Sequence, residues 1–124
     1  MKGFKVDYSK IKSTMGSGPD GAYEVPLHLA GLEVGMYAPR EIDLQSPHDR
    51  DEIYVIAAGK GEFLCGKTRT SFAPGDVFFV PIGMEHRFEN FSDDFYTWVI
   101  FQERKAADGE DQPRVDAKNT EPLA

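Results

Sequence analysis

Two histidines and one glutamate lie in two separated segments of this 124-residue chain. Residues 48–59 contain His48 and Glu52, and residues 75–90 contain His86. Both segments have the composition of strands, so we expect all three side chains to lie on strands. Two imidazoles and one carboxylate are the ligand set of a mononuclear transition-metal site with open coordination positions. The alternative is three unrelated surface or hydrogen-bonded residues. We favour the metal site.

Spacing gives the expected directions of these side chains. Side chains on a strand alternate between faces, so His48 and Glu52, four positions apart, are expected to share a face with Ser46. His86 follows a Pro-Ile-Gly turn, where its ring can point into the mouth of a barrel. Tyr54 lies two positions beyond Glu52 and is expected to line the same pocket.

The elements that must position these residues are short strands. Nine phenylalanines and five tyrosines favour β structure, and turn residues recur at roughly ten-residue spacing. The extended segments that we expect are residues 22–29, 32–37, 41–45, 52–58, 62–65, 68–72, 77–80, 86–91 and 95–102. No convincing amphipathic helix lies in the middle of the chain. This pattern predicts an all-β fold, an antiparallel sandwich or barrel.

Composition also divides the chain. Residues 1–30 are expected to form an N-terminal arm with early strands, and residues 31–102 the barrel. Residues 103–124 are charged and poor in apolar side chains, which predicts a flexible tail.

Charge and cysteine content limit the partners. A net charge of −7 argues against nucleic acid and anionic membranes, because binding to phosphates needs a basic face. The single cysteine, Cys65, excludes an intramolecular disulfide and a cysteine-based zinc cluster. No apolar run has the length of a transmembrane helix or a signal peptide. We therefore expect a cytoplasmic protein whose partner is a small molecule.

The second segment resembles, in full, the second conserved motif of the cupin superfamily. The motif residues are separated by five, one, two and three positions, and they are, in order, Gly75, Pro81, Gly83, His86 and Asn90. This spacing is specific. The surrounding sequence is also similar to that of small single-domain bacterial cupins.

The first cupin motif is present only in its second half. That motif reads glycine, five residues, histidine, one, histidine, three or four, glutamate, six, glycine. His48, Glu52 and Gly59 match its end, whereas its opening glycine and first histidine fall at Arg40 and Ser46. One ligand of the family pattern is therefore missing.

The resemblance implies a fold, a ligand set and a class of function. The fold is a double-stranded β-helix, the antiparallel jelly-roll barrel of cupins, and small cupins of this kind are often homodimers. The implied ligands are His48, Glu52 and His86, which favours Fe or Mn, with Zn, Ni or Cu as alternatives. Ser46 and Tyr54 would orient a substrate as catalytic residues. Tyr54 or His28 is a candidate proton donor.

Three functions are consistent with this resemblance. The leading expectation is a metal-dependent enzyme for a small polar organic molecule, of oxygenase, isomerase or lyase type. The missing histidine at Ser46 supports the first alternative, a non-catalytic module that binds a small molecule. The second alternative is a cupin that has lost its site and serves as a scaffold. Fold-level resemblance does not choose among them.

Overall fold

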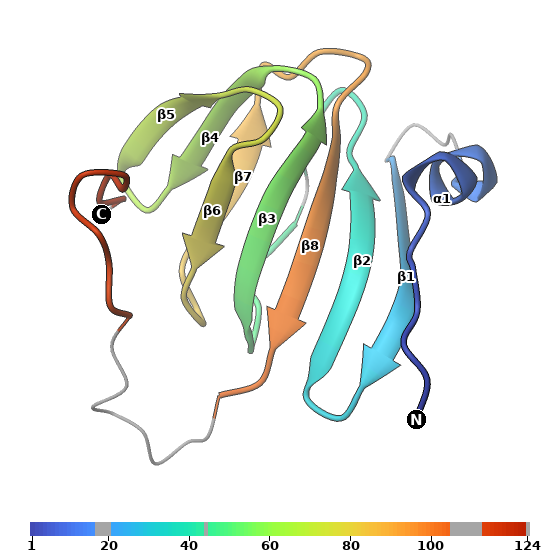
Figure 1. The fold of residues 1–124 in the computed structure, drawn as a ribbon. Coiled ribbons are helices and arrows are strands. Elements are labelled where there is room, and N and C mark those ends of the chain that lie inside the picture. Colours follow the sequence, from blue (N-terminus) through green and yellow to red (C-terminus); the bar gives the residue numbers. More distant parts are fainter. Residues whose placement is uncertain (17–20, 44, 105–112, 124) are drawn as a thin grey trace.

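The structure is a computed structural model that describes residues 1–16, 21–43, 45–104 and 113–123. Within these residues, one short helix is followed by eight strands (Figure 1). Their bounds are α1 Tyr8–Thr14, β1 Ala22–Leu29, β2 Leu32–Ala38, β3 Asp51–Ala58, β4 Gly61–Cys65, β5 Thr68–Phe72, β6 Val77–Val80, β7 His86–Glu89 and β8 Tyr96–Gln102. Eight of the nine predicted extended segments are therefore strands, with ends that differ by at most two residues.

The strands form two antiparallel sheets. The larger sheet has the order β1-β2-β8-β3-β6, and the smaller has the order β5-β4-β7. β3 is an inner strand, paired with β8 on one side and β6 on the other. β7 pairs with β4 and lies across the interior from β3 (Figure 1). The all-β antiparallel prediction is confirmed, and the two strands that carry predicted ligands belong to different sheets.

The core lies between these sheets and is mainly aromatic. The rings of Phe63 and Phe88 are 4.7 Å apart between centroids, and Phe63 is 4.5 Å from Phe78. On β8 the buried side chains alternate with half-buried ones, and the buried set is Thr97, Val99 and Phe101, with Phe95 just before the strand. Thr97, Val99 and Phe101 therefore lie on the face of β8 that turns toward the core.

Helix α1 was not predicted. Asp7 caps it, because the Asp7 carboxylate accepts a hydrogen bond from the Lys10 backbone amide. Its Tyr8 ring packs 6.3 Å from Tyr96 and 6.2 Å from Trp98, which point away from the core. The helix has seven residues and a single buried one, Ile11, so it leaves no hydrophobic period to detect.

Two segment predictions need correction. Residues 41–45 form no strand: Arg40 and Ile42 make an isolated bridge, Glu41 has a φ of 62°, and residue 44 lies outside the described residues. The strand predicted over residues 86–91 ends at Glu89, because Asn90 turns the backbone into the left-handed region with a φ of 52°.

Part of the predicted tail lies outside the described residues, namely 105–112 and 124. Residues 113–123 are mostly exposed, and Leu123 packs against the core. The flexibility of the tail and the three-part division of the chain stay predictions. In the part of the chain that the structure describes, no helix is long and apolar enough to cross a bilayer.

Two motif glycines with nearly equal φ make a matched pair for a stability test. A Cβ at Gly59 (φ 93°) would lie 2.6 Å from the Cα of Phe95, whereas one at Gly75 (φ 94°) would meet nothing within 4 Å. Both alanine variants carry the left-handed penalty of about 1–2 kcal/mol. Gly59→Ala adds a clash with backbone, which we expect to cost about 1–3 kcal/mol more. Urea unfolding measures the difference, and equal losses would contradict this packing.

Candidate metal centre

The three predicted ligands come from three different places in the fold. Glu52 is the second residue of β3, and His86 is the first residue of β7. His48 lies in the loop before β3, so the prediction that it stands on a strand is wrong. The loop still brings it to the others, because the backbone amide of Gly83 donates to the His48 carbonyl at 2.9 Å.

The donor atoms of these residues converge. Oε1 of Glu52 lies 3.4 Å from Nε2 of His48 and 3.4 Å from Nε2 of His86, and the three ligand atoms all lie within 4.8 Å of one another. With metal–ligand bonds of about 2.1 Å, neighbouring ligand atoms are separated by about 3.0–3.4 Å. The three residues therefore form a group that could hold a metal ion.

The second carboxylate oxygen of Glu52 tests whether these residues fit a metal ion. Glu52 is 1% exposed, and its Oε2 is buried without a hydrogen-bond partner among the described residues. A buried polar atom left without a partner costs about 1–3 kcal/mol, and more when it is charged. A cation held between Glu52 and the two imidazoles would remove that cost, so the residues present fit a metal.

The backbone holds the His86 ring with the correct nitrogen facing inward. Nδ1 of His86 lies 2.8 Å from the Met84 carbonyl oxygen, which can only accept, so Nδ1 carries a proton. In the neutral ring the lone pair is then on Nε2, the atom that faces Glu52. Burial lowers the pKa of His86, but the hydrogen bonds to Glu52 and Met84 and the charges of Glu52 and Asp43 raise it above its ordinary value.

Tyr54 adds a hydroxyl to the site. It is 1% exposed, and its Oη lies 3.0 Å from Nε2 of His86. Burial, and then the negative charge of Glu52, raises the pKa of Tyr54 well above its ordinary value. The phenol is therefore protonated at neutral pH and can donate a proton.

The family can now be assigned by comparison. The cupin domain family matches residues 34–101 of this chain. The chain belongs to the cupin superfamily. An uncharacterized protein of Streptomyces coelicolor is 34% identical over 103 residues, which cover 82% of this chain and 95% of that protein. The resemblance recognised in the two sequence motifs is confirmed.

Solved structures support the same fold. A cupin 2 conserved barrel domain protein from Salinispora arenicola aligns with a TM-score of 0.62 and 21% identity, covering 86% of this chain and 91% of that one. The plu4264 protein from Photorhabdus luminescens aligns with a TM-score of 0.64 and 18% identity, covering 82% and 87%. The predicted cupin jelly roll is confirmed, and this cupin carries a candidate His48/Glu52/His86 metal site.

The other residues that the sequence analysis named lie outside the three-residue group. Ser46 is exposed, and its part in catalysis stays a prediction. His28 lies on β1 with a 64% exposed side chain, 3.6 Å from a carboxylate oxygen of Glu33, and it is not part of the metal-binding group. Asn90 donates to Glu62 rather than to a ligand.

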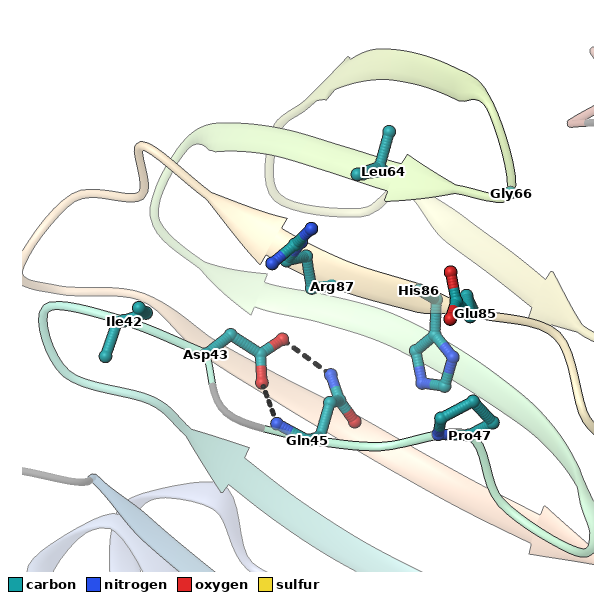
Figure 2. Close-up of a pocket in the computed structure, with 9 residues that line it drawn as sticks. All are labelled: Ile42, Asp43, Gln45, Pro47, Leu64, Gly66, Glu85, His86 and Arg87. Atoms are coloured by element: carbon teal, nitrogen blue, oxygen red, sulfur yellow. Dashed lines mark hydrogen bonds between the residues drawn. The ribbon is translucent and has the colours of Figure 1, made fainter.

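Sequence reasoning missed Gln45 and Asp43. Asp43 is 4% exposed and accepts a hydrogen bond from the Phe88 amide at 2.9 Å. The Gln45 side chain lies between Asp43 and His86 in Figure 2. The sequence signal for Gln45 was its polar side chain directly before Ser46. Counting positions along an unbroken strand pointed to Ser46 instead.

Protonation of His86 gives the metal-free and metal-bound proteins opposite pH dependences. Because the pKa of His86 is raised in the fold, the stability it contributes is present below about pH 6.5 and lost as pH rises through the folded pKa. Metal needs the neutral ring, so its stabilising effect grows over the same window. We expect the difference in melting temperature between metal-loaded and metal-free protein to increase with pH. A constant difference would contradict ligation by His86.

Proposed function

We propose that this cupin is a metal-dependent enzyme that acts on a small polar organic molecule. The buried carboxylate of Glu52 is the observation that carries the proposal, because its Oε1 lies beside two imidazole nitrogens and its Oε2 has no hydrogen-bond partner among the described residues. A carboxylate is rarely left in that state unless a cation completes it. His48, Glu52 and His86 would hold the ion.

The donor set indicates which ions suit the site. Two imidazoles with a carboxylate favour Fe or Mn, with Zn, Ni or Cu as alternatives. When bound, such an ion would supply a Lewis acid or a platform for dioxygen. Oxygenase, isomerase and lyase reactions are all compatible with it.

A cavity of about 270 Å³ adjoins His48 and would receive the substrate. Its walls include Tyr23, Tyr37, Gln45, His48, Arg50 and Tyr54. This volume lies just below the range of about 300–1,000 Å³ that is typical of small-molecule sites, which favours a compact metabolite. Hydroxyl and amide groups among these residues suit a polar ligand.

Arg50 stands at this cavity with its charge already balanced. Its guanidinium lies 4.4 Å from the centroid of the Phe101 ring and 3.1 Å from a carboxylate oxygen of Glu33. A second carboxylate, on Asp49, lies 3.8 Å away. Because these acids offset the positive charge, the cavity favours a polar substrate over a strongly anionic one.

Tyr54 is our candidate for the proton donor. It lines the cavity, and its hydroxyl contacts the metal-facing nitrogen of His86. The phenol carries its proton at neutral pH, and a substrate atom that gains negative charge would accept it. The expected homodimer and cytoplasmic location also stay proposals.

Tyr54→Phe tests the proton-donor role. We expect this variant to bind metal with wild-type stoichiometry and to lose turnover by about 10²–10⁴-fold, because general acid catalysis contributes that much. Tyr96→Phe is the matched control, since Tyr96 lies on the other face of β8 and packs against α1. Substrates are found by thermal shift of the metal-loaded protein with a metabolite library, followed by NMR detection of products. Full activity in Tyr54→Phe would contradict the role.

His86→Ala tests the metal dependence of the same activity. Removing this ligand is expected to abolish both metal binding and turnover, as measured by metal analysis and the NMR assay. Stoichiometric metal retained in His86→Ala would overturn the ligand assignment. A metabolite that binds tightly to the metal-loaded wild type without conversion would instead support a binding module.

A further inference from the structure

We propose that Gln45 is the fourth protein ligand of this centre, supplying a neutral amide oxygen in place of the histidine that the first cupin motif lacks. The inference rests on the metal centre proposed above and adds a ligand that fixed motif spacing does not predict. Four observations about Gln45 and its neighbours support it.

The first observation is the position of the amide oxygen. Oε1 of Gln45 lies 3.4 Å from Nε2 of His48, the same separation that joins this nitrogen to Glu52. That value falls within the range of about 3.0–3.4 Å for neighbouring ligands on one ion. Oε1 also lies 2.9 Å from the Tyr54 hydroxyl, which is itself 3.0 Å from Nε2 of His86. The oxygen therefore lies beside the His48 imidazole, and the Tyr54 hydroxyl links it to the His86 imidazole.

The second observation is that the direction of the amide is fixed. Nε2 of Gln45 donates to Oδ2 of Asp43 at 2.6 Å, and the Gln45 backbone amide donates to Oδ1 at 3.1 Å (Figure 2). A carboxylate accepts hydrogen bonds and cannot donate them when ionised. Turning the amide over would place its oxygen against Asp43, so the oxygen faces His48 and the Tyr54 hydroxyl.

The third observation is that Asp43 is itself anchored. It is buried, it accepts a hydrogen bond from the Tyr37 hydroxyl on β2 at 2.5 Å, and it accepts another from the Phe88 amide on β7. Strands β2 and β7, one from each sheet, thus hold Asp43 in place, and Asp43 in turn holds the Gln45 amide. Outer partners of this kind orient ligands in known metal sites.

The fourth observation concerns lone pairs. An amide oxygen has two acceptor sites, and the Tyr54 hydroxyl uses one of them. The other faces Nε2 of His48, and it is available to an ion when that nitrogen carries no proton. Ser46, which stands at the position of the missing histidine by count, is exposed and lines neither of the two cavities that border Gln45.

The consequence is a site with two nitrogen and two oxygen donors and one negative charge. Replacing an imidazole by an amide oxygen makes the donor set harder, which shifts preference toward Fe or Mn and away from Cu. The extra ligand also restores the donor count of the family pattern without its first histidine.

Cobalt titration tests the inference without any enzyme assay. Co²⁺ is added to metal-free full-length protein, and affinity is measured by calorimetry while the visible absorption bands report coordination geometry. We expect Gln45→Ala to weaken binding at least about tenfold and to change the bands, since even outer partners of ligands contribute that much. Gln102→Ala, at the exposed end of β8, is the matched control and should match the wild type.

Gln45→Glu keeps an oxygen donor at this position but replaces the group that donates to Asp43 with an acceptor, so it should bind Co²⁺ more tightly than Gln45→Ala and shift the visible bands relative to the wild type. If circular dichroism shows that Gln45→Ala is unfolded, the Gln45→Glu variant tests whether Gln45 is a ligand. Wild-type affinity and wild-type bands in Gln45→Ala would overturn the inference and leave the three-residue centre intact. Absence of Co²⁺ binding by the wild type would overturn the centre itself, and the ligand role of Gln45 with it.

Discussion

The buried carboxylate of Glu52 is the constraint on which the site depends. An inner strand of the larger sheet carries it into the interior, where water cannot reach it and where one of its oxygens has no partner. The smaller sheet brings His86 to its other oxygen. Two sheets that are held together by an aromatic core therefore enclose a negative charge that needs a cation. The candidate metal centre is a consequence of how the barrel closes.

The two motifs are also tied together by groups that bind no metal. The turn before His86 donates two backbone amides, from Gly83 to the His48 carbonyl in the loop before β3 and from Ile82 to the carboxylate of Asp51, the first residue of β3. Arg104 holds the same carboxylate with two hydrogen bonds of 2.8 Å. These contacts set the spacing of two ligands that are 38 positions apart in the chain (86 − 48).

Sequence patterns were sufficient for the strands and for the three candidate ligands, because turn residues and motif spacing are local signals. They were insufficient for features whose position depends on tertiary contacts. Helix α1 depends on the outer face of β8, which no local pattern reveals. The Gln45 oxygen faces His48 because Asp43 holds the amide nitrogen, and Asp43 is held by strands that are distant in sequence. Strand alternation correctly predicted that His48 lies near Glu52. The reason was wrong, because His48 reaches the site from a loop and not from a strand.

The most direct test of this account is elemental analysis of untagged protein purified without chelator. The account predicts about one transition-metal ion per chain, or uptake of one ion when metal is added to the metal-free protein. Iron would direct attention to oxygenase assays, and zinc or manganese to isomerase and lyase assays. Protein that is isolated without metal and also rejects added metal would contradict the central claim, and Ser46 would then mark a site that has been lost.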